Sequence, residues 1–180
     1  MFETVKEIVT KIGNRKLTWG VGGSLLLNFH SLIEHPNDID LLVKEEDEAV
    51  LNEILSSMGT SKEAKSFSPF RTVHFSKFKI GKVDIDSMGG FAIQHNEGIY
   101  RLQFDENSVV ERIDGIPLSS LEDWYVLYWL IPNKQEKAIM IEDYFKKNGV
   151  RHPRLLEKAL GQPLPNAIKE RVQEVLKKYS

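Results

Sequence analysis

The chain has 180 residues and a formal net charge of −2, from 24 basic and 26 acidic side chains. Its length allows one domain with a substantial core, or one core with a helical appendage, and its ordinary apolar and charged fractions exclude disordered and fibrous classes. The two signs of charge are interspersed, so the sequence carries no broad nucleic-acid-binding signature.

The sequence contains no cysteine, which excludes a disulfide framework and cysteine-ligated zinc. This composition favours a reducing compartment, and we expect the protein to be cytoplasmic. The first ten residues do not have the pattern of a signal peptide, and the longest apolar neighbourhood, Trp124 to Ile131, is too short to cross a bilayer. We therefore expect no membrane association.

Regular elements alternate over the first two thirds of the chain. Apolar periodicity predicts helices over residues 2–12, 24–32 and 45–58, and Gly13 and Gly59 are their expected end signals. Strands are expected over residues 17–21, 39–43, 71–80, 82–87, 91–94, 99–104 and 109–113. Residues 82–87 form either a second strand or a continuation of 71–80 past a bulge at Gly81.

The pattern becomes helical from Ser119 onwards. Ser119 and Glu122 fit a capping box at the start of a helix that ends at Pro132. Further helices are predicted over residues 134–147, 153–160 and 165–179. The expected fold class is therefore α/β, in the α+β sense, with a core over residues 1–115 and a helical C-terminal part over residues 116–180.

Two aspartates stand at the head of a buried strand, in the segment Asp38-Ile39-Asp40. Side chains alternate along a strand, so both carboxylates project to one side while Ile39 enters the core. Two ionised carboxylates at this spacing repel each other unless a cation lies between them. Hard oxygen ligands of this kind suit Mg²⁺, which often combines one or two carboxylates with substrate phosphates.

A glycine turn precedes the aspartates. Gly22, Gly23 and Ser24 lie where a predicted strand turns into a helix. The absence of Cβ atoms lets a phosphate approach the backbone closely, and the N–H groups at a helix start favour an anion. The turn is therefore a candidate phosphate site beside the candidate metal site.

A further acidic pair, Asp84-Ile85-Asp86, lies on a later predicted strand. Both side chains point the same way, so either could be the third carboxylate of a two-metal site. Such a carboxylate could act as a general base or as a ligand of the second metal ion. Glycine turn, aspartate pair and third acid together suggest phosphoryl or nucleotidyl transfer.

These motifs resemble the nucleotidyltransferase superfamily that includes DNA polymerase β. The stretch from Trp19 to Leu27 is similar to the antibiotic-modifying nucleotidyltransferases that act on lincosamides and aminoglycosides, and also to many uncharacterised bacterial proteins. Leu121-Glu122-Asp123 and Ile141-Glu142-Asp143 resemble the acidic helices that follow the third aspartate in such proteins. The resemblance covers roughly residues 17–145 and implies a mixed sheet flanked by helices.

By resemblance, Gly22, Gly23 and Ser24 would hold the phosphates of a nucleoside triphosphate, with ATP the expected donor. Asp38 and Asp40 would bind Mg²⁺ in a two-metal site, with Asp84 and Asp86 as further candidate ligands. Because Val83-Asp84-Ile85 matches the family pattern better, Asp84 is the favoured third catalytic carboxylate beside Asp38 and Asp40.

Two departures from the pattern affect the phosphate and acceptor sides. Relatives often carry an arginine and a threonine or serine ahead of the aspartate pair, where this chain has His35 and Asn37. The phosphate clamp would then be weaker, or be supplied by Arg71 or Lys82. The second helix has Asn133-Lys134-Gln135-Glu136-Lys137 in place of the arginine-containing pattern of relatives.

Several alternatives stay open. Glu97 and Glu122 are alternative bases by location, and the aromatic face of residues 124–129 could either pack or wall an acceptor cleft. A non-catalytic, regulatory or toxin-like member of the same fold is the main alternative function, and a metal-dependent phosphohydrolase is a third. The acceptor and the oligomeric state do not follow from the sequence.

Overall fold

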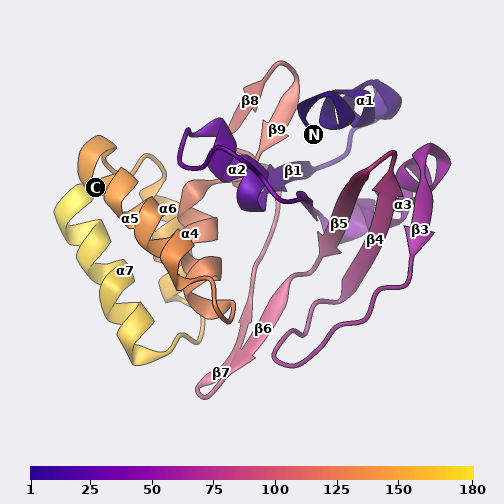
Figure 1. The fold of residues 1–180 in the computed structure, drawn as a ribbon. Coiled ribbons are helices and arrows are strands. Elements are labelled where there is room, and N and C mark those ends of the chain that lie inside the picture. Colours follow the sequence, from indigo (N-terminus) through magenta and orange to yellow (C-terminus); the bar gives the residue numbers. More distant parts are fainter.

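The computed structural model describes residues 1–180 as a mixed seven-stranded sheet with helices on both sides of it and a small separate hairpin (Figure 1). The prediction of a mixed α/β fold with C-terminal helices is confirmed. No helix is of sufficient length and apolarity to span a bilayer.

The helices follow the predicted periodicity, except that the second ends at Phe29 and not at residue 32. They are α1 (Phe2–Ile12), α2 (Gly23–Phe29), α3 (Glu48–Met58), α4 (Leu121–Leu130), α5 (Gln135–Asn148), α6 (Pro153–Leu160) and α7 (Asn166–Tyr179), with 3₁₀ turns η1 (Glu45–Asp47) and η2 (Glu106–Ser108). Gly13 ends α1 at a φ of 62°, which a residue with a side chain rarely adopts.

The strands are short. They are β1 (Trp19–Gly22), β2 (Ile39–Val43), β3 (Thr60–Lys62), β4 (His74–Ile80), β5 (Val83–Gly89), β6 (Ala92–His95), β7 (Gly98–Arg101), β8 (Glu111–Ile113) and β9 (Ile116–Leu118). The large sheet has the order β3-β4-β5-β2-β1-β9-β8, and β6 pairs with β7 alone. Strand β2 runs antiparallel to β1 and parallel to β5. Strands β4 and β5 form an antiparallel hairpin through Gly81, which settles the open choice in favour of two strands.

The strand register places one polar row across the centre of the sheet. Gly22 of β1 is paired with Asp40 of β2, Asp40 with Asp86 of β5, and Asp86 with Lys77 of β4. Directly opposed residues share a face of the sheet, so these four positions lie side by side although they come from four different segments. This row locates the candidate site.

An apolar row follows on the same face, two residues further along each strand. Leu42 is opposed to Met88, and Met88 to Phe75. Leu42 is buried, whereas Met88 and Phe75 are only partly covered. The charged row and the partly covered apolar pair therefore border the same open face.

One hydrophobic cluster of 39 buried residues runs from Val5 of α1 to Val175 of α7. It joins the sheet to the C-terminal helices. The predicted boundary between residues 115 and 116 falls inside the β8–β9 hairpin, and β9 pairs with β1 in the large sheet. The helices begin three residues after β9, and a division into two domains stays a prediction.

Helix α4 is capped one residue later than expected. The side chain of Ser120, not that of Ser119, accepts a hydrogen bond from the Asp123 N–H at 2.9 Å. Ser119 instead donates its hydroxyl to the carbonyl oxygen of Val21 in β1, at 2.7 Å. Ser119, which the local pattern alone predicted as the helix cap, is thus engaged in a tertiary hydrogen bond with β1 instead.

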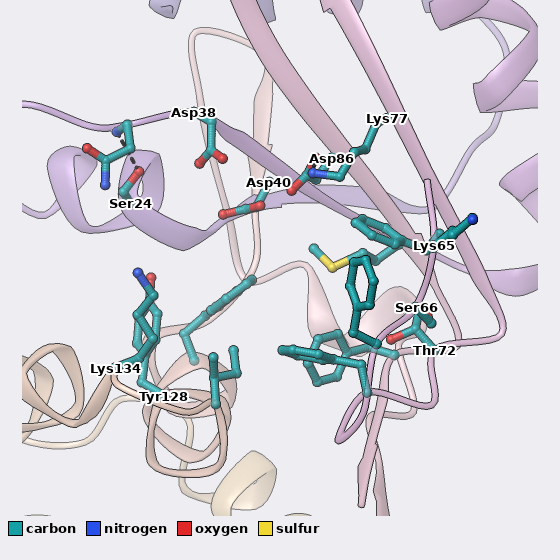
Figure 2. Close-up of a pocket in the computed structure, with 18 of the residues that line it drawn as sticks. Ser24, Asp38, Asp40, Lys65, Ser66, Thr72, Lys77, Asp86, Tyr128 and Lys134 are labelled. Atoms are coloured by element: carbon teal, nitrogen blue, oxygen red, sulfur yellow. Dashed lines mark hydrogen bonds and ion pairs between the residues drawn. The ribbon is translucent and has the colours of Figure 1, made fainter. Parts of the chain in front are cut away.

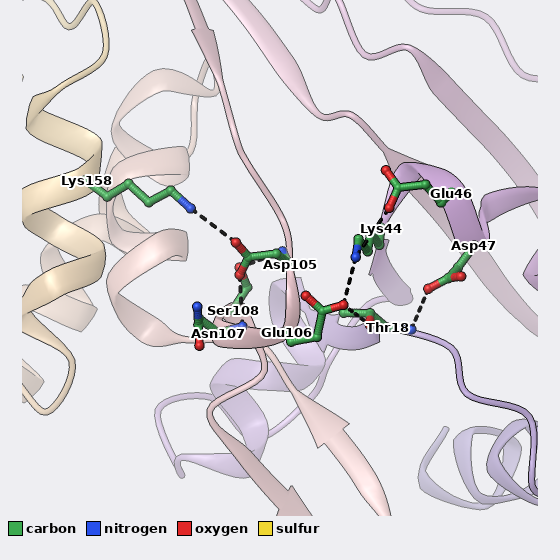
Figure 3. A network of polar contacts seen from close by, with 9 residues as sticks. All are labelled: Thr18, Lys44, Glu46, Asp47, Asp105, Glu106, Asn107, Ser108 and Lys158. Atoms are coloured by element: carbon green, nitrogen blue, oxygen red, sulfur yellow. Dashed lines mark hydrogen bonds and ion pairs between the residues drawn. The ribbon is translucent and has the colours of Figure 1, made fainter.

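A network of polar contacts lies at the C-terminal end of β2, away from the aspartates (Figure 3). Lys44, directly after β2, contacts Glu106 at 2.8 Å and Glu46 at 3.3 Å. Asp47 accepts a hydrogen bond from the Thr18 N–H at 2.8 Å. Exposed ion pairs add little stability, so the main consequence is a fixed C-terminal end of β2, opposite the end at which Asp38 lies.

Candidate active site

Three carboxylates meet at the N-terminal end of β2. Oxygen atoms of Asp38, Asp40 and Asp86 all lie within 4.8 Å of one another (Figure 2). Asp40 and Asp86 are brought together by the parallel pairing of β2 with β5, and Asp38 precedes β2 by one residue. The three oxygens are close enough to share bound cations.

The electrostatics of this cluster favour a bound cation. Burial, together with the neighbouring carboxylates of Asp38 and Asp86, raises the pKa of Asp40 to about 8, against opposing effects of Lys137 and Lys77. Burial also raises the pKa of Asp86, which Lys77 partly offsets from 3.3 Å. A set of three oxygen ligands with one open side fits Mg²⁺, which keeps positions for water and phosphate oxygens.

Two separate constraints, one of backbone conformation and one of space, require a glycine at position 23, in the turn into α2. Its φ of 59° lies in the left-handed region, and a Cβ at this position would overlap the carboxylate of Asp40. The glycine thus lets the turn and β2 lie in direct contact. The candidate phosphate site and the carboxylates therefore share one boundary.

Helix α4 is packed against the same turn. The Trp124 ring occupies the space where a Cβ of Gly22 would lie, and its Nε1 donates to Ser119 Oγ at 2.9 Å. Ser119 in turn donates to Val21 of β1, so two hydrogen bonds fix the tryptophan on the strand. Trp124 is both a core residue and part of the wall of the site.

Ser24 is buried and lines the site. Its Oγ accepts a hydrogen bond from the Asn37 N–H at 3.0 Å, which connects the start of α2 to the residue before the aspartates. The serine hydroxyl proton remains available to donate to a ligand. Asn37 thus holds Ser24 through its backbone, so the bond does not depend on the side chain at position 37.

The structure does not bring Asp84, the favoured third carboxylate, into the cluster. Asp84 is half exposed and contacts Lys62 of β3 at 3.1 Å, and this ion pair lowers its pKa. The register explains the difference, because Asp86, not Asp84, is directly opposed to Asp40. The two aspartates share a face, but a step of two residues places Asp84 near the start of β5, away from Asp40.

The predicted phosphate-binding arginine also lies elsewhere. Arg71 is exposed and donates to the carbonyl oxygen of Phe70 at 3.1 Å, and neither Arg71 nor Lys82 lines the site. Two lysines that the sequence analysis did not select, Lys134 and Lys137, line it instead. The sequence feature that could have identified these lysines is the presence of two cations at the start of a helix, where the helix dipole disfavours positive charge.

The alternative bases have other partners. Glu122 is buried and accepts hydrogen bonds from the N–H groups of Arg151 and His152, at 3.1 and 3.2 Å. Glu97 lies beside His95 at 3.5 Å. Neither glutamate lines the site that holds the three aspartates.

The carboxylates border a cavity of about 610 Å³ between the sheet and helices α4 and α5. Asp38, Asp40 and Asp86 lie on one side of it, and Tyr128 and Lys134 lie on the other (Figure 2). The Lys137 Nζ lies 5.5 Å from the centre of the Tyr128 ring. The sequence left open whether the aromatic face of α4 packs in the core or walls a cleft. Trp124 and Tyr128 do both, since each is buried and each lines the cavity.

Two solved structures illustrate the similarity of this fold to known ones. A protein of Thermotoga maritima described as a candidate nucleotidyltransferase is 23% identical, with a TM-score of 0.60 over 82% of this chain and 93% of its own. The structure of ANT(2'')-Ia in complex with adenylyl-2''-tobramycin is 16% identical, with a TM-score of 0.55 over 96% of both chains. At these identities the likeness shows the fold. No curated protein matches the sequence.

The family comparison covers more than half of the chain. The model of the aminoglycoside-2''-adenylyltransferase family matches residues 4–123, from α1 to the first turn of α4. This range contains the glycine turn and all three clustered aspartates. The chain therefore belongs to the aminoglycoside-2''-adenylyltransferase family and is a nucleotidyltransferase.

Proposed function

We propose that the protein transfers a nucleoside monophosphate from a Mg²⁺-bound nucleoside triphosphate, with ATP as the expected donor, to a hydroxyl group of an acceptor. The observation that carries this proposal is the meeting of Asp38, Asp40 and Asp86 within 4.8 Å, directly beside the glycine turn. Carboxylate oxygens and a close backbone approach are the two features that a metal-bound triphosphate needs.

The triphosphate lies along the turn in this proposal. Gly22 and Gly23 let it approach the backbone, and the Ser24 hydroxyl donates to a phosphate oxygen. Lys134 and Lys137 contribute positive charge from the opposite wall, the role that the sequence analysis assigned to Arg71 or Lys82. The β- and γ-phosphates therefore lie at the Ser24 end of the cavity.

The reaction is a displacement at the α-phosphorus. The acceptor hydroxyl oxygen forms a bond to the α-phosphorus, the bond from this atom to the bridging oxygen of the β-phosphate breaks, and pyrophosphate leaves. Asp86, the carboxylate farthest along the sheet from the glycine turn, takes the hydroxyl proton on one carboxylate oxygen, while its other oxygen would help to hold the metal ions. When bound, the metal ions would polarise the phosphoryl group and offset the negative charge that develops on the oxygens.

Calorimetry of MgATP binding tests the metal assignment. We expect Asp40→Ala and Asp86→Ala to bind MgATP at least tenfold more weakly than wild type, because each loses a metal ligand. Asp84→Ala is the matched control, since it removes a carboxylate from the same face of β5 that is paired with Lys62 outside the cavity. Equal affinity in wild type, Asp40→Ala and Asp86→Ala would rule out the site.

Pyrophosphate release tests the transfer itself. We expect release from MgATP in the presence of hydroxyl acceptors, and its loss in Asp86→Ala. Release that depends on an acceptor excludes the non-catalytic alternative. Hydrolysis of simple phosphoesters without nucleotide would support the phosphohydrolase alternative instead.

A further inference from the structure

The cavity has two chemically different ends. Ser24 and the three aspartates occupy one end, and the far end beyond Asp86 carries a cluster of apolar side chains beside Lys65, Ser66 and Thr72 (Figure 2). This apolar wall consists of Phe67, Phe70, Phe75, Met88 and Phe91. Phe75 and Met88 come from paired positions of β4 and β5, and Phe67 and Phe70 from the segment between β3 and β4.

The apolar wall is a built surface. Phe70 packs edge-on against Phe91, with ring centres 6.0 Å apart, and forms a backbone bridge with Ile93 of β6. The Phe70 position is therefore held by the β6–β7 hairpin as well as by its own segment. Phe67 is 71% exposed and lies at the rim, where a ligand would cover it.

The geometry of displacement assigns this end to the acceptor, an argument that rests on the proposed function. The attacking and leaving oxygens of an in-line displacement lie on opposite sides of the phosphorus. With the leaving pyrophosphate at Ser24, the acceptor approaches from beyond Asp86. That approach passes along the apolar wall.

The charges at this end do not suit a polycation. Four acidic residues line the whole cavity, and three of them are the clustered aspartates, which the metal ions would occupy. The fourth, Glu63, is already 3.5 Å from Lys65. No unpaired carboxylate therefore remains at this end to receive the ammonium groups of an aminoglycoside.

We infer that the acceptor is a hydroxyl compound with an apolar or aromatic body and no net positive charge, in contrast to the aminoglycoside in the complex of ANT(2'')-Ia. Burial of that body against Phe70, Phe75 and Met88 supplies the affinity. The lack of a free carboxylate for ammonium groups supplies the discrimination against polycations. Membership of the family indicates the transfer chemistry, whereas the side chains that line the cavity determine which acceptor binds.

Two probes test this inference on the whole protein saturated with Mg²⁺ and a non-hydrolysable ATP analogue. Tobramycin is the polycation. Its binding is measured by calorimetry in the presence of the analogue, and its turnover is measured by pyrophosphate release with MgATP in place of the analogue. The anionic aromatic dye 8-anilinonaphthalene-1-sulfonate reports on the apolar wall by fluorescence. We expect no tobramycin binding or turnover, and saturable dye binding.

Substitutions locate the dye. Phe75→Asp and the rim variant Phe67→Asp should each weaken dye binding at least tenfold, and thermal unfolding checks that both are folded. Val73→Asp is the matched control, because Val73 is an exposed apolar residue of the same segment that does not line the cavity. Its dye affinity should equal that of wild type.

The outcomes separate the two proposals. Binding or nucleotidylation of tobramycin by wild type would overturn the inference. So would dye affinity that Phe67→Asp and Phe75→Asp leave unchanged. Failure of wild type to bind MgATP in calorimetry would overturn the proposed function instead, whatever the two probes show.

Discussion

Gly23 joins the candidate phosphate turn to the candidate metal ligand Asp40 by two separate constraints, its positive φ and the lack of room for a Cβ beside the Asp40 carboxylate. We expect Gly23→Ala to lower the free energy of unfolding by about 1–2 kcal/mol from the backbone conformation alone. The added methyl group must also displace the Asp40 carboxylate. Mg²⁺ affinity should therefore fall at least tenfold, as measured by calorimetry with MgATP.

Gly81 provides the matched control for this prediction. Its φ is 60°, nearly that of Gly23, but no atom lies within 4 Å of the position of an added Cβ. Gly81→Ala should show the same loss of stability in thermal unfolding with unchanged MgATP affinity. Equal affinity in the two variants would show that contact with Asp40 has no part in metal binding.

The residues of the site differ in how far the sequence could predict them. Gly23, Ser24, Asp38 and Asp40 lie in one short segment, and local spacing selected all four. The choice of Asp86 over Asp84 depends on the register between β2 and β5, which the alternation of side chains in one strand does not reveal. Both aspartates fit the same face, and only the opposed partner distinguishes them.

Helix α5 carries two lysines where the helix dipole disfavours them, at its N-terminal end. Lys137 is partly buried, and burial and Lys134 lower its pKa, against the opposing effects of Asp40 and Asp38. This placement costs stability in the protein without ligand. A triphosphate between the two walls would offset that cost.

We expect Lys137→Met to weaken MgATP binding roughly tenfold, which is the size of one charge-assisted contact, because methionine keeps the apolar stem and removes the charge. Unfolding should require equal or more free energy. Lys147→Met in the last turn of α5 is the control, since Lys147 is exposed and does not line the cavity. Unchanged affinity in Lys137→Met, measured by calorimetry, would remove α5 from the phosphate site.

At the scale of elements, long periodic segments were predicted well and short ones were not. Helices α1 and α6 and strand β2 have the expected bounds. Strands β3 and β9, with three residues each, carry no alternation that could identify them, and they exist through pairing with β4 and with β1 and β8. Tertiary contact, which local pattern does not encode, decides such elements.

At the scale of the whole molecule, helix α4 meets the β6–β7 hairpin and α6 at one junction. Asp123 in the first turn of α4 lies at this junction, only 4% exposed, and one carboxylate oxygen has no hydrogen-bond partner. Burial raises the pKa of Asp123 to about 7. Ser120 and Lys158 oppose the shift, and Glu122 and Asp105 add to it. The junction therefore contains a group that prefers to be protonated in the folded state.

This group makes stability fall with rising pH. Between the unfolded pKa near 4 and the folded value near 7, the folded chain binds more protons than the unfolded chain, so the free energy of unfolding decreases through that window. From pH 5 to pH 7 the loss amounts to at most about 3 kcal/mol. Asp123→Asn should reduce the slope over this interval, with Asp40 contributing the part that remains, as measured by chemical unfolding at several pH values, while the exposed Asp143→Asn should keep the wild-type slope. Because one hydrophobic cluster spans the sheet and the C-terminal helices, we expect a single transition in each case, and equal slopes for wild type and Asp123→Asn would contradict the assignment.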